Sequence, residues 1–110
     1  MNKNNEEHFE VLRKIEKNPE LSQRELAKDL GFSLGKLNYS LNALIYKGFV
    51  KINNFRSKKN KTRYIKYVLT PEGISERTKL TLNFMKRKMR EYDELRKELN
   101  SHKKIFKNRK

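Results

Sequence analysis

The side chains best suited to act on another molecule lie between residues 33 and 42. Asn38 and Asn42 carry amides that donate and accept at once, which is the pairing that recognises adenine in the major groove of DNA. Lys36 can donate to the N7 and O6 atoms of guanine, and nearby hydroxyls can bind phosphates or base edges. The full candidate set is Ser33, Lys36, Asn38, Tyr39, Ser40 and Asn42. This chemistry predicts a helix that reads nucleic acid.

A second candidate set is purely cationic. It comprises Arg56, Lys58, Lys59, Lys61 and Arg63. Such side chains attract the phosphate backbone and supply affinity without choosing a sequence. We expect them to lie against a minor groove or the flanking backbone. A merely solvated lysine-rich loop is the alternative interpretation.

The charge of the chain is concentrated in two segments. The 110 residues carry a formal net charge of +15, and residues 30–71 hold nine basic side chains and no acidic ones. Residues 1–29 are nearly neutral and residues 72–99 are slightly basic, while residues 100–110 add five basic side chains. A surface selected only for solubility would mix both signs. Residues 30–71 are called the acid-free segment below. Their nine cations and lack of carboxylates predict a face that approaches phosphates.

Catalysis is not predicted. The chain has no cysteine, and His8 and His102 stand at opposite ends, where we expect solvated residues. Glu25 is explained by helix capping, and the carboxylates near residue 94 alternate with cations as on a salt-bridged helix. We therefore expect a protein that is not an enzyme and that has no metal site and no cofactor.

The N-terminus is polar and unlike a secretory signal, and no run of about 18 apolar residues is present to span a membrane. A cytoplasmic location is the expectation that follows.

Hydrophobic spacing predicts the helices that position the first candidate set. Phe9, Leu12 and Ile15 form one apolar stripe on a helix from about residue 5 to residue 17. The run from Ser22 to Glu25 predicts a capping box that opens a second helix, which ends at Gly31. Ser33 then caps a third helix closed by Gly48. The predicted inner face of that helix is Leu34, Leu37, Leu41, Leu44 and Ile45.

Two segments with a two-residue period, 49–55 and 64–69, flank the cationic set and predict a β-hairpin with a charged tip. Thr70, Pro71 and Glu72 then predict the start of a last helix that runs to about Leu99.

The last helix has an apolar side that the preceding residues can cover only in part. Its exposed members are predicted to be Leu82, Met85, Met89, Tyr92, Leu95 and Leu99. The same helix of a second chain is the simplest partner, so we expect a homodimer; a long solvated helix is the alternative. The basic tail, residues 101–110, is expected to be disordered.

This order of elements predicts a mainly α fold with a small β-hairpin, namely a winged helix-turn-helix followed by a long helix. Residues 1–70 would form the DNA-binding domain, residues 71–100 the dimerisation helix and residues 101–110 the tail. Two equivalent lobes favour double-stranded DNA with an inverted repeat as the partner.

Two stretches resemble a known family. The run SQRELAKDLGFSLGKLNYSLNALIYKGFVKI resembles the helix-turn-helix of MarR-type winged-helix regulators. The run KNKTRYIKYVLTPEGISERTKLTLNFMKRKMREYDELRKEL resembles the small MarR group associated with exopolysaccharide (EPS) gene clusters. The resemblance implies a homodimeric DNA-binding transcriptional regulator acting near polysaccharide genes.

The resemblance has limits. Larger MarR proteins carry an Asp-Arg-Arg triplet on the wing, and the matching stretch here is Lys61-Thr62-Arg63, so only Arg63 carries over. Larger members also have more helices at both ends, around an effector pocket. A single long C-terminal helix argues against such a pocket and against a small-molecule effector.

A basic module that binds RNA or a membrane surface, without gene-regulatory specificity, is the alternative function. The near charge balance of the last helix disfavours lipid binding. The few candidate stacking residues, Tyr39, Tyr46 and Phe55, disfavour RNA. A pure dimerisation adaptor would leave the acid-free segment unexplained.

Overall fold

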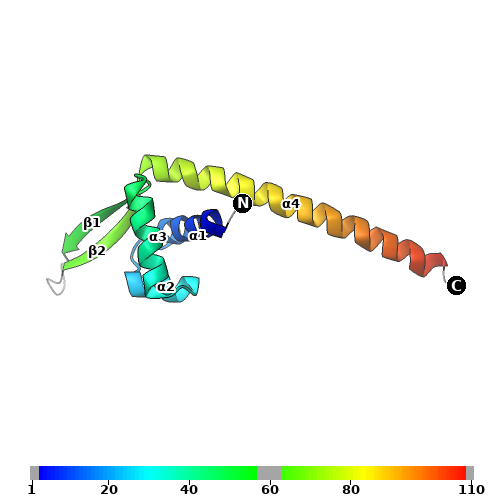
Figure 1. The fold of residues 1–110 in the computed structure, drawn as a ribbon, viewed down its shortest axis with the longest axis horizontal. Coiled ribbons are helices and arrows are strands. Elements are labelled where there is room, and N and C mark those ends of the chain that lie inside the picture. The colour runs from blue at the N-terminus through cyan, green and yellow to red at the C-terminus, as the bar shows by residue number, and fades with distance from the viewer. Residues whose placement is uncertain (1–2, 57–62, 109–110) are drawn as a thin grey trace. The chain divides into compact units, whose positions relative to one another are not determined.

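The computed structural model describes residues 3–56 and 63–108 of the chain. Within these residues, three helices, a hairpin and a last helix follow one another (Figure 1). They are α1 (Lys3–Lys17), α2 (Gln23–Leu30), α3 (Leu34–Tyr46), β1 (Val50–Arg56), β2 (Arg63–Leu69) and α4 (Pro71–Asn108). The predicted mainly α architecture with a small hairpin is confirmed. Contacts divide the chain into two units, one ending at Leu80 and the other starting at Thr81.

The first unit is built on an apolar core to which α1 contributes one whole face. Phe9, Leu12 and Ile15 are each at most 5% exposed, which confirms the predicted stripe. The rest of the core consists of Val11, Leu26, Ala27, Leu37, Leu41, Leu44, Val50, Leu69 and Leu80. Each large aliphatic side chain contributes about 2 kcal/mol by leaving water. Because α3 buries Leu37, Leu41 and Leu44 here, its opposite side is turned outward.

Capping fixes both ends of the turn between α2 and α3. Ser22 Oγ accepts from the Glu25 N–H at 3.2 Å, and Glu25 Oε1 accepts from the Ser22 N–H at 3.3 Å, so the predicted capping box is confirmed. Gly31 ends α2 at a φ of 69°, a left-handed conformation that glycine adopts without steric cost. Ser33 then caps α3. The short turn predicted between the two helices is therefore present.

One predicted inner-face residue of α3 is instead exposed. Leu34 is 45% exposed, whereas Leu37 and Leu44 are fully buried. Leu34 is the first residue of α3, and helical side chains lean toward the N-terminus of their helix. Its side chain therefore projects past the packed part of the helix.

The hairpin pairs antiparallel, from Val50 opposite Leu69 at its base to Arg56 opposite Arg63. Its base is buried, since Val50 and Leu69 belong to the core. Figure 1 shows β1 and β2 lying side by side as a wing beside α3. The tip, residues 57–62, lies outside the described residues.

Hydrogen bonds around Thr70 join the hairpin to the start of α4. The Thr70 N–H donates to the Phe49 carbonyl at 3.0 Å, and the Thr70 hydroxyl donates to the Gly48 carbonyl. The Gly73 N–H donates to Thr70 Oγ1 at 3.0 Å, which confirms Thr70 as the cap of α4. A Cβ atom at Gly73 would lie 2.0 Å from the Phe49 carbonyl oxygen. This close approach requires glycine.

The last helix is longer than predicted. α4 continues to Asn108, well past the predicted end near Leu99. The expectation that the tail from residue 101 is disordered is therefore wrong for residues 101–108. These residues include neither glycine nor proline, and cations near a helix C-terminus interact favourably with the helix dipole. A basic composition alone does not end a helix that lacks a breaker.

Candidate nucleic-acid interface

The outward side of α3 is polar and aromatic and includes no carboxylate. Asn38 and Asn42 are exposed, and Tyr39 is 74% exposed. Tyr46, named from the sequence only as a candidate stacking residue, is 93% exposed. It stands seven positions after Tyr39, and that spacing returns to the same face of a helix. Tyr46 therefore adds a second exposed aromatic ring to this face, although the candidate DNA-contact set did not include it.

The two asparagines have different surroundings. Asn38 Oδ1 accepts a hydrogen bond from Gln23 Nε2 at 3.2 Å, a contact between α2 and α3. To bind adenine through both the N–H and the oxygen of its amide, Asn38 would have to share its Oδ1 between Gln23 and the base. Asn42 lies one turn further along the exposed face of α3. It is the better candidate for base contact. Gln23 is an orienting residue that the sequence did not reveal.

Ser33 stands at the N-terminus of α3, where backbone N–H groups favour an anion. Its Oγ accepts from the Lys36 N–H at 3.1 Å. The Ser33 hydroxyl hydrogen is not used in that bond, so the residue can cap the helix and donate to a phosphate at the same time.

Lys36 is held by groups of its own chain. Its Nζ lies 2.9 Å from Glu7 Oε1 and 4.3 Å from the centroid of the Phe32 ring. The side chain remains 40% exposed. In a similar way, Lys66 of β2 pairs with Glu20. The acid-free segment thus receives carboxylates from outside it, and among its described cations Lys36 and Lys66 are partly neutralised.

One predicted contact residue is wrong. Ser40 is 2% exposed and lies on the buried side of α3. It follows Leu37 by three positions and precedes Leu44 by four, and both spacings return to one helix face. A side chain in this place cannot reach DNA. A small hydroxyl residue is compatible with the inner face, and its type misled the prediction.

The cationic set of the wing falls largely outside the described residues. Arg56 and Arg63 are the paired ends of β1 and β2, but their side chains, like Lys58, Lys59 and Lys61, lie outside the described part. Lys51, earlier in β1, is described and exposed. The wing therefore remains a prediction from the sequence, attached to a hairpin whose backbone is described.

His8 differs from its expected solvated state. It is half-buried, and burial lowers the pKa of its imidazole, with the charge of Lys47 acting in the same direction. No cluster of three or more His, Cys, Asp or Glu side chains able to hold a metal is found among the described residues.

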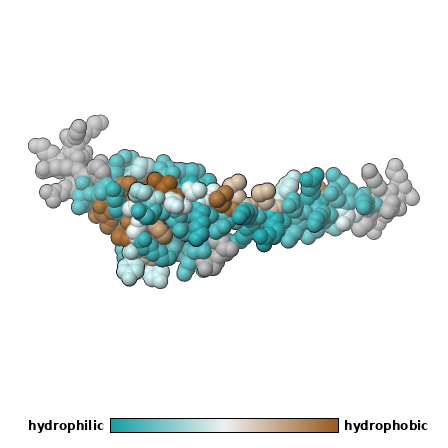
Figure 2. All heavy atoms as spheres, turned by 90° about the horizontal axis from the view of Figure 1, so that it is seen from above, coloured by the Kyte–Doolittle hydropathy of each residue, from teal (hydrophilic) through white to brown (hydrophobic). Residues whose placement is uncertain are grey.

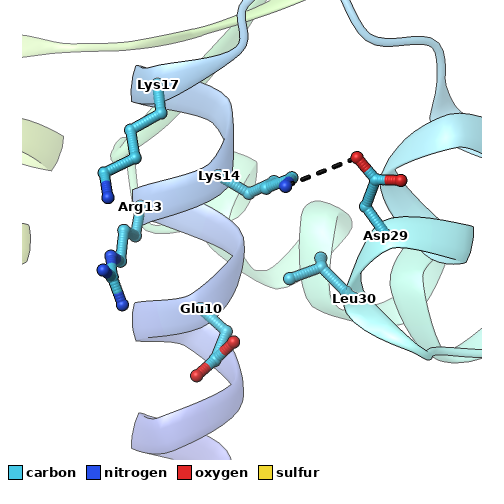
Figure 3. Close-up of a pocket in the computed structure, with 6 residues that line it drawn as sticks. All are labelled: Glu10, Arg13, Lys14, Lys17, Asp29 and Leu30. Atoms are coloured by element: carbon cyan, nitrogen blue, oxygen red, sulfur yellow. Dashed lines mark ion pairs between the residues drawn. The ribbon is translucent and has the colours of Figure 1, made fainter.

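Figure 3 shows a surface hollow between α1 and α2 that is lined by charged side chains. Lys14 crosses it to pair with Asp29 at 3.4 Å. Arg13 and Lys17 extend along α1, and Glu10 lies beyond Arg13 on the same helix. Cations and carboxylates are mixed here, so the hollow lacks the single sign that phosphate binding requires. The face of α3 is the better candidate site.

None of the helices in the described part of the chain has the length and apolar content needed to cross a membrane.

Residues 5–51 match the family described as winged helix-turn-helix DNA-binding. A comparison with curated proteins gives no match.

Solved structures share the fold. A mutant of MepR from S. aureus matches with a TM-score of 0.65 and 19% identity, over 96% of this chain and 74% of that chain. Staphylococcus aureus MarR in complex with salicylate and kanamycin matches with a TM-score of 0.62 and 21% identity, over 90% and 69%. A mutant of MarR from E. coli complexed with operator DNA matches with a TM-score of 0.54 and 27% identity, over 67% and 51%.

The family match covers α1, α2, α3 and the start of β1, which are the elements that build the candidate face. The chain therefore has a winged helix-turn-helix fold shared with solved MarR structures, and residues 5–51 are similar to the DNA-binding domains of the matched family.

Proposed function

We propose that the chain is a sequence-specific regulator of transcription of the MarR type, which binds double-stranded DNA as a homodimer. The observation that carries this proposal is the outward face of α3. It presents Asn42 and Tyr39 without a carboxylate, directly after the turn of a helix-turn-helix. The known DNA complex of a protein with this fold supports the same partner.

In the proposed complex α3 enters the major groove. Asn42 reads a base edge, and the Tyr39 hydroxyl binds phosphate or base while its ring can touch a thymine methyl group. The N-terminus of α3 with Ser33 receives a phosphate. The cationic set of the wing contacts the flanking backbone and raises affinity for all sequences.

Substituting Asn42 with alanine is expected to relax base preference. The ratio of affinities for the preferred duplex and a scrambled duplex should fall by roughly 10–100-fold, because a paired amide contact is lost. Asn38→Ala should have a smaller effect, since Gln23 already engages its oxygen. Fluorescence anisotropy with both duplexes measures the ratio.

Lys59→Ala is the comparison for that experiment. It should weaken binding to both duplexes by the same factor, since a phosphate contact carries no sequence information. Equal changes in preference for the Asn42 and Lys59 variants would contradict the assignment of base reading to α3.

The homodimer is proposed from the apolar side of α4. Six large side chains from Leu82 to Leu99 are each more than half exposed. Met89→Asp would place a charge in the middle of this stripe, and we expect it to convert the dimer largely to monomer in sedimentation analysis. Asn83→Asp adds the same charge on the opposite face of the helix and should leave the dimer intact. A wild-type monomer at micromolar concentration would contradict the proposal.

The target genes are proposed from sequence resemblance alone. The resemblance to the EPS-associated group favours polysaccharide biosynthesis genes, read through an inverted repeat. Footprinting the protein on the region upstream of its own gene and of adjacent genes tests this. A protected inverted repeat is expected, and protection without two related half-sites would contradict it.

The alternative, an RNA-binding or membrane-surface module, makes different predictions. A duplex of random sequence, a single-stranded RNA and anionic vesicles serve as competitors for the footprinted duplex. The proposed function requires the specific duplex to bind at least about 10³-fold more tightly than random DNA. Equal competition by RNA or vesicles would favour the alternative.

A further inference from the structure

The second unit of the chain carries an apolar stripe with a regular spacing. Leu82, Met85, Met89, Tyr92, Leu95 and Leu99 are between 52% and 64% exposed. Figure 2 shows brown and tan atoms interrupting the hydrophilic surface along part of α4. Five of these residues follow the alternating steps of three and four of a two-stranded coiled coil, whereas Leu95 falls at a flanking g position. Leu82, Met89 and Arg96 then occupy its a positions, while Met85, Tyr92 and Leu99 occupy its d positions.

The charges of this helix are separated along its length. Residues 81–90 hold four basic side chains and no acidic ones, whereas residues 91–99 hold four acidic side chains and two basic ones. Along one chain, Glu91 already pairs with Arg87 and Lys88 where the two parts meet. A surface that is basic in one half and acidic in the next complements itself when it is turned end over end.

We infer that α4 pairs with α4 of a second copy in an antiparallel coiled coil whose two-fold axis passes between Arg90 and Glu91. This inference rests on the proposed homodimer and specifies its geometry. In antiparallel coiled coils, a positions face d positions of the other helix. About this axis, Leu82 faces the partner's Leu99, and Met89 faces the partner's Tyr92.

The remaining core layer also suits this arrangement. Met85 faces the partner's Arg96, so the apolar stem of the arginine packs on a flexible thioether while its head reaches water. The basic residues 86–90 lie opposite the acidic part of the partner, residues 91–95. At the flanking e positions, Lys86 faces the partner's Asp93, and the symmetry of the dimer makes this pair twice.

A parallel, in-register pair fits less well. It retains one attractive flanking pair, Lys88 with the partner's Asp93. It also stacks Arg96 on the partner's Arg96 in the core and sets the four cations of residues 81–90 against the same four. Burying like charges together costs more than a flanking ion pair returns.

The antiparallel register also sets the distance between equivalent residues of the two copies. Thr81, where the second unit begins, lies opposite residue 100 of the other copy. The two copies of Thr81 are then separated along the axis by roughly 30 Å, at about 1.5 Å per residue.

Engineered disulfides in the full chain test this inference, because the protein has no cysteine of its own. Leu82→Cys and Leu99→Cys are prepared as separate variants of different mass, and both positions are exposed. Under oxidising conditions neither variant alone should cross-link, because its two cysteines lie about 25 Å apart in the antiparallel pair. A mixture of the two should form a heterologous cross-link on a non-reducing gel.

A charge exchange gives the second readout. Lys86→Glu alone places a glutamate opposite the partner's Asp93, and the two-fold symmetry repeats this repulsion. We expect about tenfold weaker dimerisation in sedimentation equilibrium. Adding Asp93→Lys should restore the dimer. Lys104→Glu changes the charge equally on the same helix, beyond residues 82–99, and should leave the dimer unchanged.

The outcomes separate this inference from the proposed function. Cross-linking of each cysteine variant with itself would overturn the antiparallel register and establish a parallel pair. A wild-type dimer with no cross-link in any sample, or no rescue by the double charge exchange, would overturn the pairing through this stripe. A wild-type monomer would instead contradict the homodimer. A wild-type dimer that does not bind the duplex would contradict the proposed regulatory function but not the antiparallel pairing.

Discussion

Gly73→Ala is expected to be the most destabilising single-methyl change in the first unit. The added Cβ would lie 2.0 Å from the Phe49 carbonyl oxygen, which is also the acceptor for the Thr70 N–H. The atoms that the Cβ would meet all belong to the backbone of Phe49, so the start of α4 must move away from the base of the hairpin. The free energy of unfolding should fall by roughly 3 kcal/mol, as for severe overpacking. That loss corresponds to a decrease in Tm of about 10–20 °C for a domain of this size.

Gly35→Ala is the matched control. Gly35 lies in α3, is exposed, and has nothing within 4 Å of an added Cβ. Alanine favours the helix over glycine by up to about 1 kcal/mol, so this variant should unfold at an equal or higher temperature. Thermal unfolding followed by circular dichroism measures both variants. An unchanged Tm for Gly73→Ala would show that the approach of α4 to Phe49 is looser than described.

Affinity for DNA is expected to fall steeply with salt. The acid-free segment holds nine cations, of which Lys36 and Lys66 already have carboxylate partners. If about six of these cations contact phosphates, the slope of log K against log[salt] is about −5. Affinity then falls roughly 10³-fold between about 50 and 200 mM salt. Anisotropy titrations at several salt concentrations give the slope.

Two variants make that measurement specific. Lys59→Ala removes one proposed phosphate contact and should reduce the slope by about one. Lys17→Ala removes an equal charge from α1, outside the acid-free segment and beside the hollow of Figure 3, and should leave the slope unchanged. A slope near zero for the wild type, or equal effects of both variants, would contradict phosphate binding by this segment.

The ion pair between Lys36 and Glu7 changes how the recognition helix is understood. Lys36 is 2.9 Å from a carboxylate of α1, so contact with guanine requires it to exchange that partner. Such an exchange lowers the net gain from a lysine–guanine contact. We therefore expect base preference to depend more on Asn42 than on Lys36.

Local features of the sequence account for most of the elements. Ser22, Glu25 and Gly31 specify the ends of α2 through hydrogen bonds and a left-handed backbone that act within a few residues. The stripe of Phe9, Leu12 and Ile15 is set by the period of the helix. These interactions are short in sequence, and residue type and spacing therefore reveal them.

Two predictions were wrong although residues close in the sequence carried the signal. The hydroxyl of Ser40 predicts a DNA contact, but its spacing from Leu37 and Leu44 places it in the core. The end of α4 was placed too early because charge was given more weight than the absence of a breaker between residues 100 and 108.

The sequence by itself determined the winged helix-turn-helix order, the caps and the side of each helix that is buried, because these follow from periodicity and from contacts within a few residues. Only the tertiary structure decided which polar side chains of α3 have partners. Glu7 and Gln23 come from α1 and α2, and their contacts with Lys36 and Asn38 exist only once the three helices are packed. The need for glycine at position 73 has the same origin, since it depends on a backbone carbonyl that lies far away in the chain.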